Sequence, residues 1–137
     1  MKRLLSHSLI VILLCCCITP VLVHAQGEAT PYYSIIQSLS ADLLLDEQTG
    51  NATCIGSVQA TYGTAVSVTV ELQVLEGNRW KVLQSWENSR TSFVKCSGNC
   101  TIEAGHTYRT YVIGYTMDAD GNITESGHTS KSYDYPA

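Results

Sequence analysis

Residues 104–125, Ala-Gly-His-Thr-Tyr-Arg-Thr-Tyr-Val-Ile-Gly-Tyr-Thr-Met-Asp-Ala-Asp-Gly-Asn-Ile-Thr-Glu, predict a turn, a long strand, a tight turn and the start of another strand. Residues 107–117 are rich in Thr, Tyr, Val and Ile, which fit a pleated, half-buried surface. In residues 118–122, Gly121 is free to adopt a positive φ angle and its Asp and Asn neighbours tolerate one. This predicted hairpin indicates an all-β protein.

Alternating apolar and polar residues predict further strands on the N-terminal side of this hairpin. The alternation is most regular in residues 65–76, where five valine or leucine side chains point one way and polar ones the other. A helix over residues 32–38 remains an alternative for the start of the domain. Together the patterns predict an antiparallel immunoglobulin-like β-sandwich of about seven strands. The other predicted strands are residues 38–45, 51–62, 80–87, 91–96 and 123–133, with a break at 88–90.

The chain of 137 residues has room for one domain behind a leader peptide. Lys2 and Arg3 precede an uncharged apolar run, and small or aliphatic residues end at Ala25, so residues 1–25 are expected to be a signal peptide. A membrane anchor is the rival interpretation, but the apolar run is short for a span. We expect a flexible segment at residues 26–37 and the sandwich domain at residues 38–137.

The charge of the exported part argues against some classes of partner. Two of the eight basic residues lie in the leader, so six remain against twelve acids. An acidic domain with scattered bases is a poor candidate for binding nucleic acid or an anionic membrane. Once the leader is removed, we therefore expect a secreted, extracellular protein that is monomeric.

The segment Gly105-His-Thr-Tyr-Arg109, followed by alternating residues and the Asp-Gly-Asn turn, resembles the end of a fibronectin type III or related immunoglobulin-like domain. The resemblance implies that Tyr108 forms a tyrosine corner, with its ring buried and its hydroxyl bonded to nearby backbone. It also implies that Tyr108, Thr110, Val112 and Gly114 face the core. Unlike the immunoglobulin pattern, residues 53–60 contain no Trp.

A second resemblance covers most of the exported chain. Residues 50–58, 71–73, 80–86 and 105–109 are together similar to a family of short, uncharacterised exported proteins of Gram-positive, clostridia-type bacteria. This resemblance implies export and the β-sandwich, and it implies no catalytic residue.

Three cysteines remain after the leader, so one thiol is left over if a disulfide forms. Cys96-Ser-Gly-Asn-Cys100 encloses a predicted turn, which favours a Cys96–Cys100 bridge with Cys54 buried and free. A bridge from Cys54 to Cys96 or Cys100 across the two sheets is the alternative. Both depend on export to an oxidising compartment.

No pattern of catalytic or metal-binding residues stands out, and we expect neither an enzyme nor a cofactor nor a metal. The two histidines of the exported part, His106 and His128, have no motif around them that supplies a nucleophile or a base. Residues 118–122 offer alternating oxygen ligands, but the Gly precedes the place that a calcium loop requires, so a hairpin turn is favoured. Asn51, Asn99 and Asn122 fit the N-glycosylation pattern and lie in predicted turns.

A binding surface is the more credible source of function. Tyr, Trp and Arg are the residues that dominate recognition surfaces. The alternative is that one of their rows is simply the core, because a shift of one residue exchanges the two faces of a strand. We therefore expect a non-enzymatic binding or cell-surface module for an extracellular protein or carbohydrate, and alternatively a self-associating structural or matrix component. The candidate residues are Trp80, Trp86, Arg109, Tyr111 and Tyr115.

Overall fold

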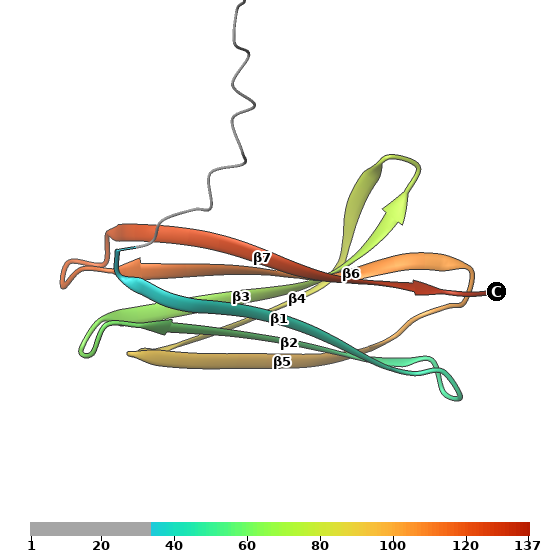
Figure 1. Ribbon diagram of the computed structural model, residues 1–137, viewed down its shortest axis with the longest axis horizontal. Helices are drawn as coiled ribbons and strands as arrows, with labels where there is room; N and C mark the ends of the chain where they lie inside the picture. Colours follow the sequence, from blue (N-terminus) through green and yellow to red (C-terminus); the bar gives the residue numbers. More distant parts are fainter. Residues whose placement is uncertain (1–33) are drawn as a thin grey trace, which may run out of the picture. The chain divides into compact units, whose positions relative to one another are not determined.

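The computed structural model describes residues 34–137 (Figure 1). The predicted signal peptide and most of the predicted flexible segment lie outside these residues. The described chain forms seven antiparallel strands in two sheets, which confirms the predicted β-sandwich. The strands are β1 Ile36–Asp46, β2 Asn51–Ala60, β3 Ala65–Glu76, β4 Arg79–Thr91, β5 Phe93–Thr101, β6 His106–Met117 and β7 Ile123–Tyr135. In this part of the chain, no helix is long and apolar enough to cross a membrane.

The two sheets divide the strands three and four. The smaller sheet has the order β1-β2-β5 and the larger has the order β4-β3-β6-β7. Strand β1 begins at Ile36, so the helix considered for residues 32–38 is replaced by strand in the part that the structure describes. An irregularity in the pairing of β1 with β2 between Ile36 and Ser38 lets both Ile36 and Leu43 face the core.

The core lies between the sheets and consists largely of valines. The alternation predicted for β3 holds, with Val66, Val68, Val70 and Leu72 completely buried. They face Val58 and Cys54 of β2. Gly114 allows the sheets to approach closely, because a Cβ atom there would lie 2.7 Å from Val58 Cγ2. This core packs against the inner face of the four-stranded sheet and leaves the side chains of its outer face free to form a separate surface.

Strands β4 and β5 are longer than the sequence predicts. The predicted break at residues 88–90 is strand, and so is the predicted turn at residues 97–99. The chain passes from one sheet to the other at Ser92, whose φ of 66° is the one positive value at a non-glycine residue in the described chain. The Ser92 backbone bonds both Thr64 O and Ala60 N, and its hydroxyl accepts from Gly63 N, so the corner is held by three hydrogen bonds.

A β-bulge in β4 reverses which side chains face outward. Gln73 pairs with Val82 whereas Leu72 pairs with Gln84, so Leu83 has no partner in the ladder. The alternation therefore shifts by one residue at Leu83. Beyond the bulge, the tip of the β3–β4 hairpin bends away from the sandwich (Figure 1, yellow-green).

Side-chain hydrogen bonds close the seam between the edge strands β1 and β7 at both ends. At one end, the Glu125 carboxylate accepts from the backbone amides of Ser34, Ile35 and Ile36 at 2.7, 3.0 and 2.6 Å. At the other end, the hydroxyls of Tyr133 and Tyr135 both donate to Glu47, at its carboxylate and its carbonyl oxygen. These contacts cover one edge of the sandwich.

Candidate binding face

The outer face of the four-stranded sheet carries a group of aromatic and charged side chains, which we call the aromatic face. Alternation along β6 places Arg109, Tyr111 and Tyr115 on this side, opposite the buried Thr110 and Val112. The pairing of β6 with β7 adds His128, opposite Ile113. The aromatic face is defined by Trp80, Arg109, Tyr111, Tyr115 and His128.

Four of these side chains form one continuous stack. The Arg109 guanidinium carbon lies 4.2 Å from the centroid of the Trp80 ring and 4.8 Å from that of Tyr111. The Tyr111 and His128 rings follow with centroids 5.7 Å apart and planes 34° from parallel. A guanidinium over the faces of two aromatic rings is attracted to both through cation–π interactions. The stack also anchors the projecting hairpin, which carries Trp80, to β6.

Two buried or half-buried polar side chains of β3 fix the guanidinium within the stack. Arg109 Nε donates to Gln73 Oε1 at 2.7 Å, and Gln73 Nε2 donates to Glu71 Oε2 at 2.6 Å. Gln73 is only 6% exposed. The carboxylate orients the amide and the amide orients the guanidinium, so Arg109 is held in one geometry although it has no ion pair within residues 34–137.

Trp86, a candidate residue for the binding surface, does not lie on the aromatic face. The bulge at Leu83 turns it toward the other sheet, where its indole covers Gly98 of β5. A Cβ atom at Gly98 would lie 1.9 Å from Trp86 Cε2. Trp86 is therefore a packing residue that joins β4 to β5.

Tyr108 opens β6 on its inner side. Its ring is buried, and its hydroxyl donates to Glu103 O at 2.9 Å while accepting from Glu103 N at 3.1 Å. Both bonds tie the β5–β6 connection back onto the sheet. This is the hydrogen bonding that a tyrosine corner provides.

The described chain contains no disulfide, and its geometry argues against the Cys96–Cys100 bridge that the sequence favoured. Cys96 and Cys100 lie four residues apart on the single strand β5, which places their Cα atoms about 13 Å apart. A disulfide needs about 7 Å or less. Cys54 cannot join the two sheets either, because β2 and β5 are neighbours in the same sheet; it lies opposite Gly98, diagonal to both other cysteines. All three cysteines of the described chain are free thiols.

Burial makes two of these thiols poor nucleophiles. Desolvation raises the pKa of Cys54 and, likewise, that of Cys96. Cys100 is partly exposed, and its thiol donates to the carbonyl oxygen of Thr101 at 3.6 Å. The chemistry of an activated cysteine is therefore absent from Cys54 and Cys96.

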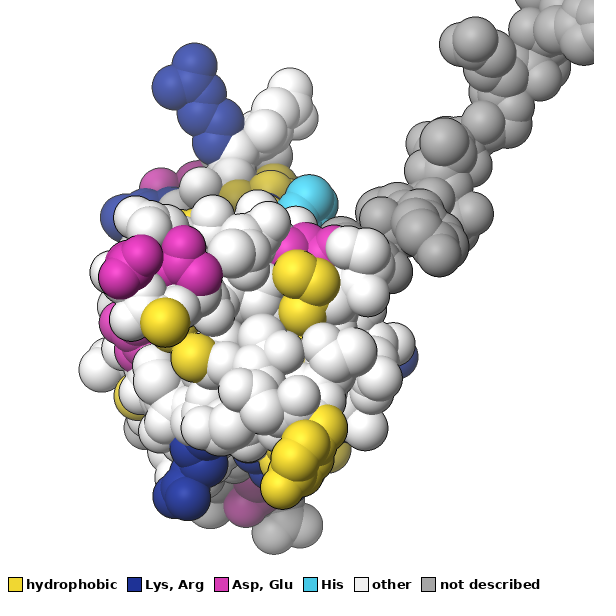
Figure 2. All heavy atoms as spheres, turned by 90° about the vertical axis from the view of Figure 1, so that its left-hand side faces the viewer, with side chains coloured by type: hydrophobic (Ala, Val, Ile, Leu, Met, Phe, Trp, Pro, Cys, Tyr) yellow, Lys and Arg dark blue, Asp and Glu magenta, His cyan; other side chains and the backbone are white. Residues whose placement is uncertain are grey.

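The Asp118 carboxylate organises the β6–β7 turn. It accepts from the backbone amides of Asp120 and Asn122 at 3.0 and 2.8 Å and from the Asn122 side chain. These bonds, with that of the Asn122 side chain foremost, lower the pKa of Asp118. Figure 2 faces the end of the sandwich that carries this turn, where apolar side chains are separated by polar atoms.

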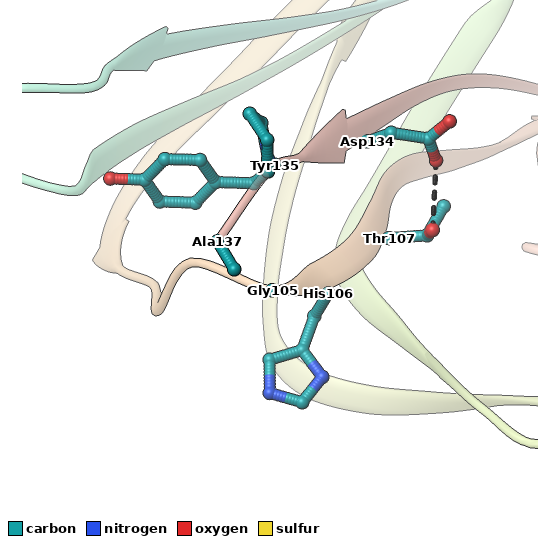
Figure 3. A pocket seen from close by; sticks show the side chains of 7 residues that line it. Gly105, His106, Thr107, Asp134, Tyr135 and Ala137 are labelled. Atoms are coloured by element: carbon teal, nitrogen blue, oxygen red, sulfur yellow. Dashed lines mark hydrogen bonds between the residues drawn. The ribbon is translucent and has the colours of Figure 1, made fainter.

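A hollow of about 440 Å³ lies where β6 begins and β7 ends (Figure 3). Asp134 in this hollow accepts a hydrogen bond from the Thr107 hydroxyl at 2.8 Å, and His106 points away from Tyr135. His106 instead packs against the edge of the Tyr108 ring. The hollow therefore presents no acid–base pair. Among residues 34–137, no three His, Cys, Asp or Glu side chains gather as metal ligands.

Comparison with known protein families found no match for the chain, and comparison with curated proteins found none either. The aromatic face therefore has to be interpreted from its own chemistry. Sequence reasoning found four of its members and considered His128 only as a catalytic residue. It missed the role of Gln73 and Glu71. The alternation of β3 places both side chains on the outer face of the sheet, and this pattern could have indicated them.

Proposed function

We propose that this chain is a secreted, non-enzymatic binding module of immunoglobulin-like architecture, which contacts an extracellular protein or carbohydrate through the aromatic face. The observation that carries the proposal is the stack of Trp80, Arg109, Tyr111 and His128 on the outside of the sheet. Rigid aromatic and arginine side chains lose little conformational freedom on binding, so they contribute strongly to affinity.

Binding to arrays of extracellular glycans and surface proteins tests this function. We expect wild-type protein to bind at least one array component, and we expect the double substitution W80A/Y111A to remove that binding. Phe93→Ala is the matched control, because Phe93 is an exposed aromatic residue (51%) on the three-stranded sheet. Binding that depends on Phe93 and not on Trp80 and Tyr111 contradicts the proposal.

Export is part of the same proposal and has its own measurement. The leader pattern supports secretion with cleavage after Ala25. We expect an intact mass that corresponds to residues 26–137 in the culture medium. A cell-bound protein that retains residues 1–25 contradicts secretion.

Self-association as a structural component is the second candidate. Strand β4 is an edge strand of the larger sheet, and Val82 and Leu83 near the hairpin tip are 48% and 43% exposed. An exposed apolar edge is a place where two copies can pair. Sedimentation at increasing concentration distinguishes the candidates: a binding module stays monomeric, whereas a matrix component forms larger species that L83K disrupts.

A further inference from the structure

The Arg109 guanidinium has an unused edge. Of its five N–H donors, the one on Nε is taken by Gln73. The guanidinium also lies over the Trp80 and Tyr111 rings. Within residues 34–137, the terminal nitrogens of Arg109 have no hydrogen-bond or ion-pair partner; the ion pair of the described chain joins Lys81 to Glu76. The fork formed by the two terminal NH₂ groups is therefore oriented and free.

This fork fits a carboxylate. A planar guanidinium and a planar carboxylate form two parallel charge-assisted hydrogen bonds, which is a geometry that lysine cannot reproduce. The Glu71 carboxylate accepts from Gln73, and within residues 34–137 it forms no hydrogen bond or ion pair with Arg109. Because the stack and Gln73 already fix the guanidinium, little conformational entropy is lost when an anion binds.

The surroundings of the fork suit a sugar chain. Ser132 and Ser130 lie directly across from Arg109 and Tyr111 in the ladder, and both are exposed. They place hydroxyl groups beside the stack on an open sheet face. A protein interface usually has a more apolar centre. Of the strongly exposed apolar residues, Leu44 and Phe93 lie on the three-stranded sheet, and Ile123 lies at the start of β7, five residues before His128.

We propose that the ligand of the aromatic face is an acidic polysaccharide and that Arg109 binds the carboxylate of one of its sugar units. This inference rests on the proposed function and names the class of its ligand. The serine hydroxyls and the edges of the aromatic rings contact the sugar around that carboxylate. The domain carries excess negative charge, so affinity comes from these contacts and not from long-range attraction.

Calorimetric titration with carboxylated oligosaccharides tests the inference. The probes are fragments of polygalacturonate, alginate and hyaluronate, each compared with its methyl ester, which keeps the sugar and removes the charge. We expect at least one acid form to bind, and its ester to bind at least about tenfold more weakly, since a lost charge-assisted bidentate contact is worth roughly 1.4 kcal/mol or more. Equal binding of acid and ester, or no binding by any acid form, overturns the inference.

Substitutions locate the contact. R109K keeps the positive charge and removes the fork, so we expect it to weaken binding by about the same factor as esterification. R90Q is the matched control, because Arg90 is an exposed arginine on β4 away from the stack. If R109K loses its fold, the comparison of acid with ester on wild-type protein decides alone.

The outcomes also separate this inference from the proposed function. In one outcome, the protein binds a neutral glycan or a protein on the array, loses that binding in W80A/Y111A, and shows no preference for acid over ester. This result supports the binding module and rejects the acidic ligand. If wild-type protein binds an acidic glycan on the array and R109K loses binding to the same glycan, the result supports both the binding module and the acidic ligand.

Discussion

The indole of Trp86 lies directly on the backbone of Gly98. Strand β4 of one sheet therefore contacts β5 of the other because Trp86 supplies a large side chain and Gly98 has none. Cys96 and Cys100 lie on the same side of β5, to either side of Gly98. Gly98 thus leaves the space that the indole of Trp86 fills.

Gly98→Ala should destabilise the protein by about 1–3 kcal/mol, because the new methyl group overlaps the indole. W86L should also destabilise it. The double variant G98A/W86L should be more stable than the sum of the two effects predicts, since the smaller side chain leaves room for the methyl group. Urea unfolding of the four proteins measures this coupling. Strict additivity would contradict the contact.

Tyr108→Phe should lower the free energy of unfolding by about 1–3 kcal/mol. The substitution removes the hydroxyl that bonds both the N–H and the carbonyl of Glu103 and leaves these groups without that partner. Tyr115→Phe, on the outer face of the same strand, is the control and should be nearly neutral. Equal effects of the two substitutions would argue against a structural role for the Tyr108 hydroxyl.

Thr110→Val should stabilise the protein by about 1 kcal/mol. Thr110 is completely buried, and within residues 34–137 its Oγ1 has no hydrogen-bond partner of normal geometry. The nearby thiol of Cys54 is at best a weak partner. Valine has the same shape without the desolvated hydroxyl. Thermal unfolding measures the change, and a lower melting temperature would show that the hydroxyl is satisfied.

Stability should fall as the pH drops below about 4.5, in part through Glu125. The amide of Ile36, with those of Ser34 and Ile35, lowers the pKa of Glu125 from its usual 4.5. A carboxyl group whose pKa is lower in the folded than in the unfolded state stabilises the fold above the unfolded pKa. That contribution is lost as the pH falls through the folded pKa.

Melting temperatures of wild type and E125Q between about pH 3 and pH 6 test this linkage. E125Q should show a shallower decline, and the remaining decline should reflect Asp46 and Asp118, whose pKa values are also lowered by hydrogen bonds. If the melting temperatures of the two proteins fell with pH in parallel, protonation of Glu125 would not contribute to the loss of stability.

Alkylation should distinguish the three cysteines without prior reduction. Cys100 should react first in the folded protein because it is partly exposed, whereas Cys54 and Cys96 are buried and have raised pKa values. After unfolding, all three should react. Peptide mapping assigns the sites, and a Cys96–Cys100 bridge in the folded protein would contradict the continuous strand β5.

Much of the fold follows from alternation, because the buried face of a sheet requires apolar residues at every second position of a strand. Val66 and Val112 therefore appear in the core where the sequence predicts them. The wrong predictions arise where the same local sequence pattern is compatible with two structures, a turn and a strand. Ser97-Gly-Asn99 has turn composition, yet Gly98 is needed in a strand because an indole from the other sheet occupies its side.

The candidate face could be predicted only in part for a similar reason. The composition of β6 indicates Arg109 and Tyr111, but the bulge at Leu83 that separates Trp80 from Trp86 leaves no clear mark in the sequence. The bond from Arg109 to Gln73 depends on the register between β3 and β6, which single-strand periodicity does not contain.

The closed seam between β1 and β7 has a mechanical consequence. The start of β7 is bonded to the start of β1 and the end of β7 to the turn after β1, so the two strands run side by side in the same direction (Figure 1). A force that pulls Ser34 and Ala137 apart therefore acts along both strands and slides one past the other. Contacts loaded in this shearing direction must break together, whereas peeling would break them one at a time. A domain built this way resists tension between its two ends.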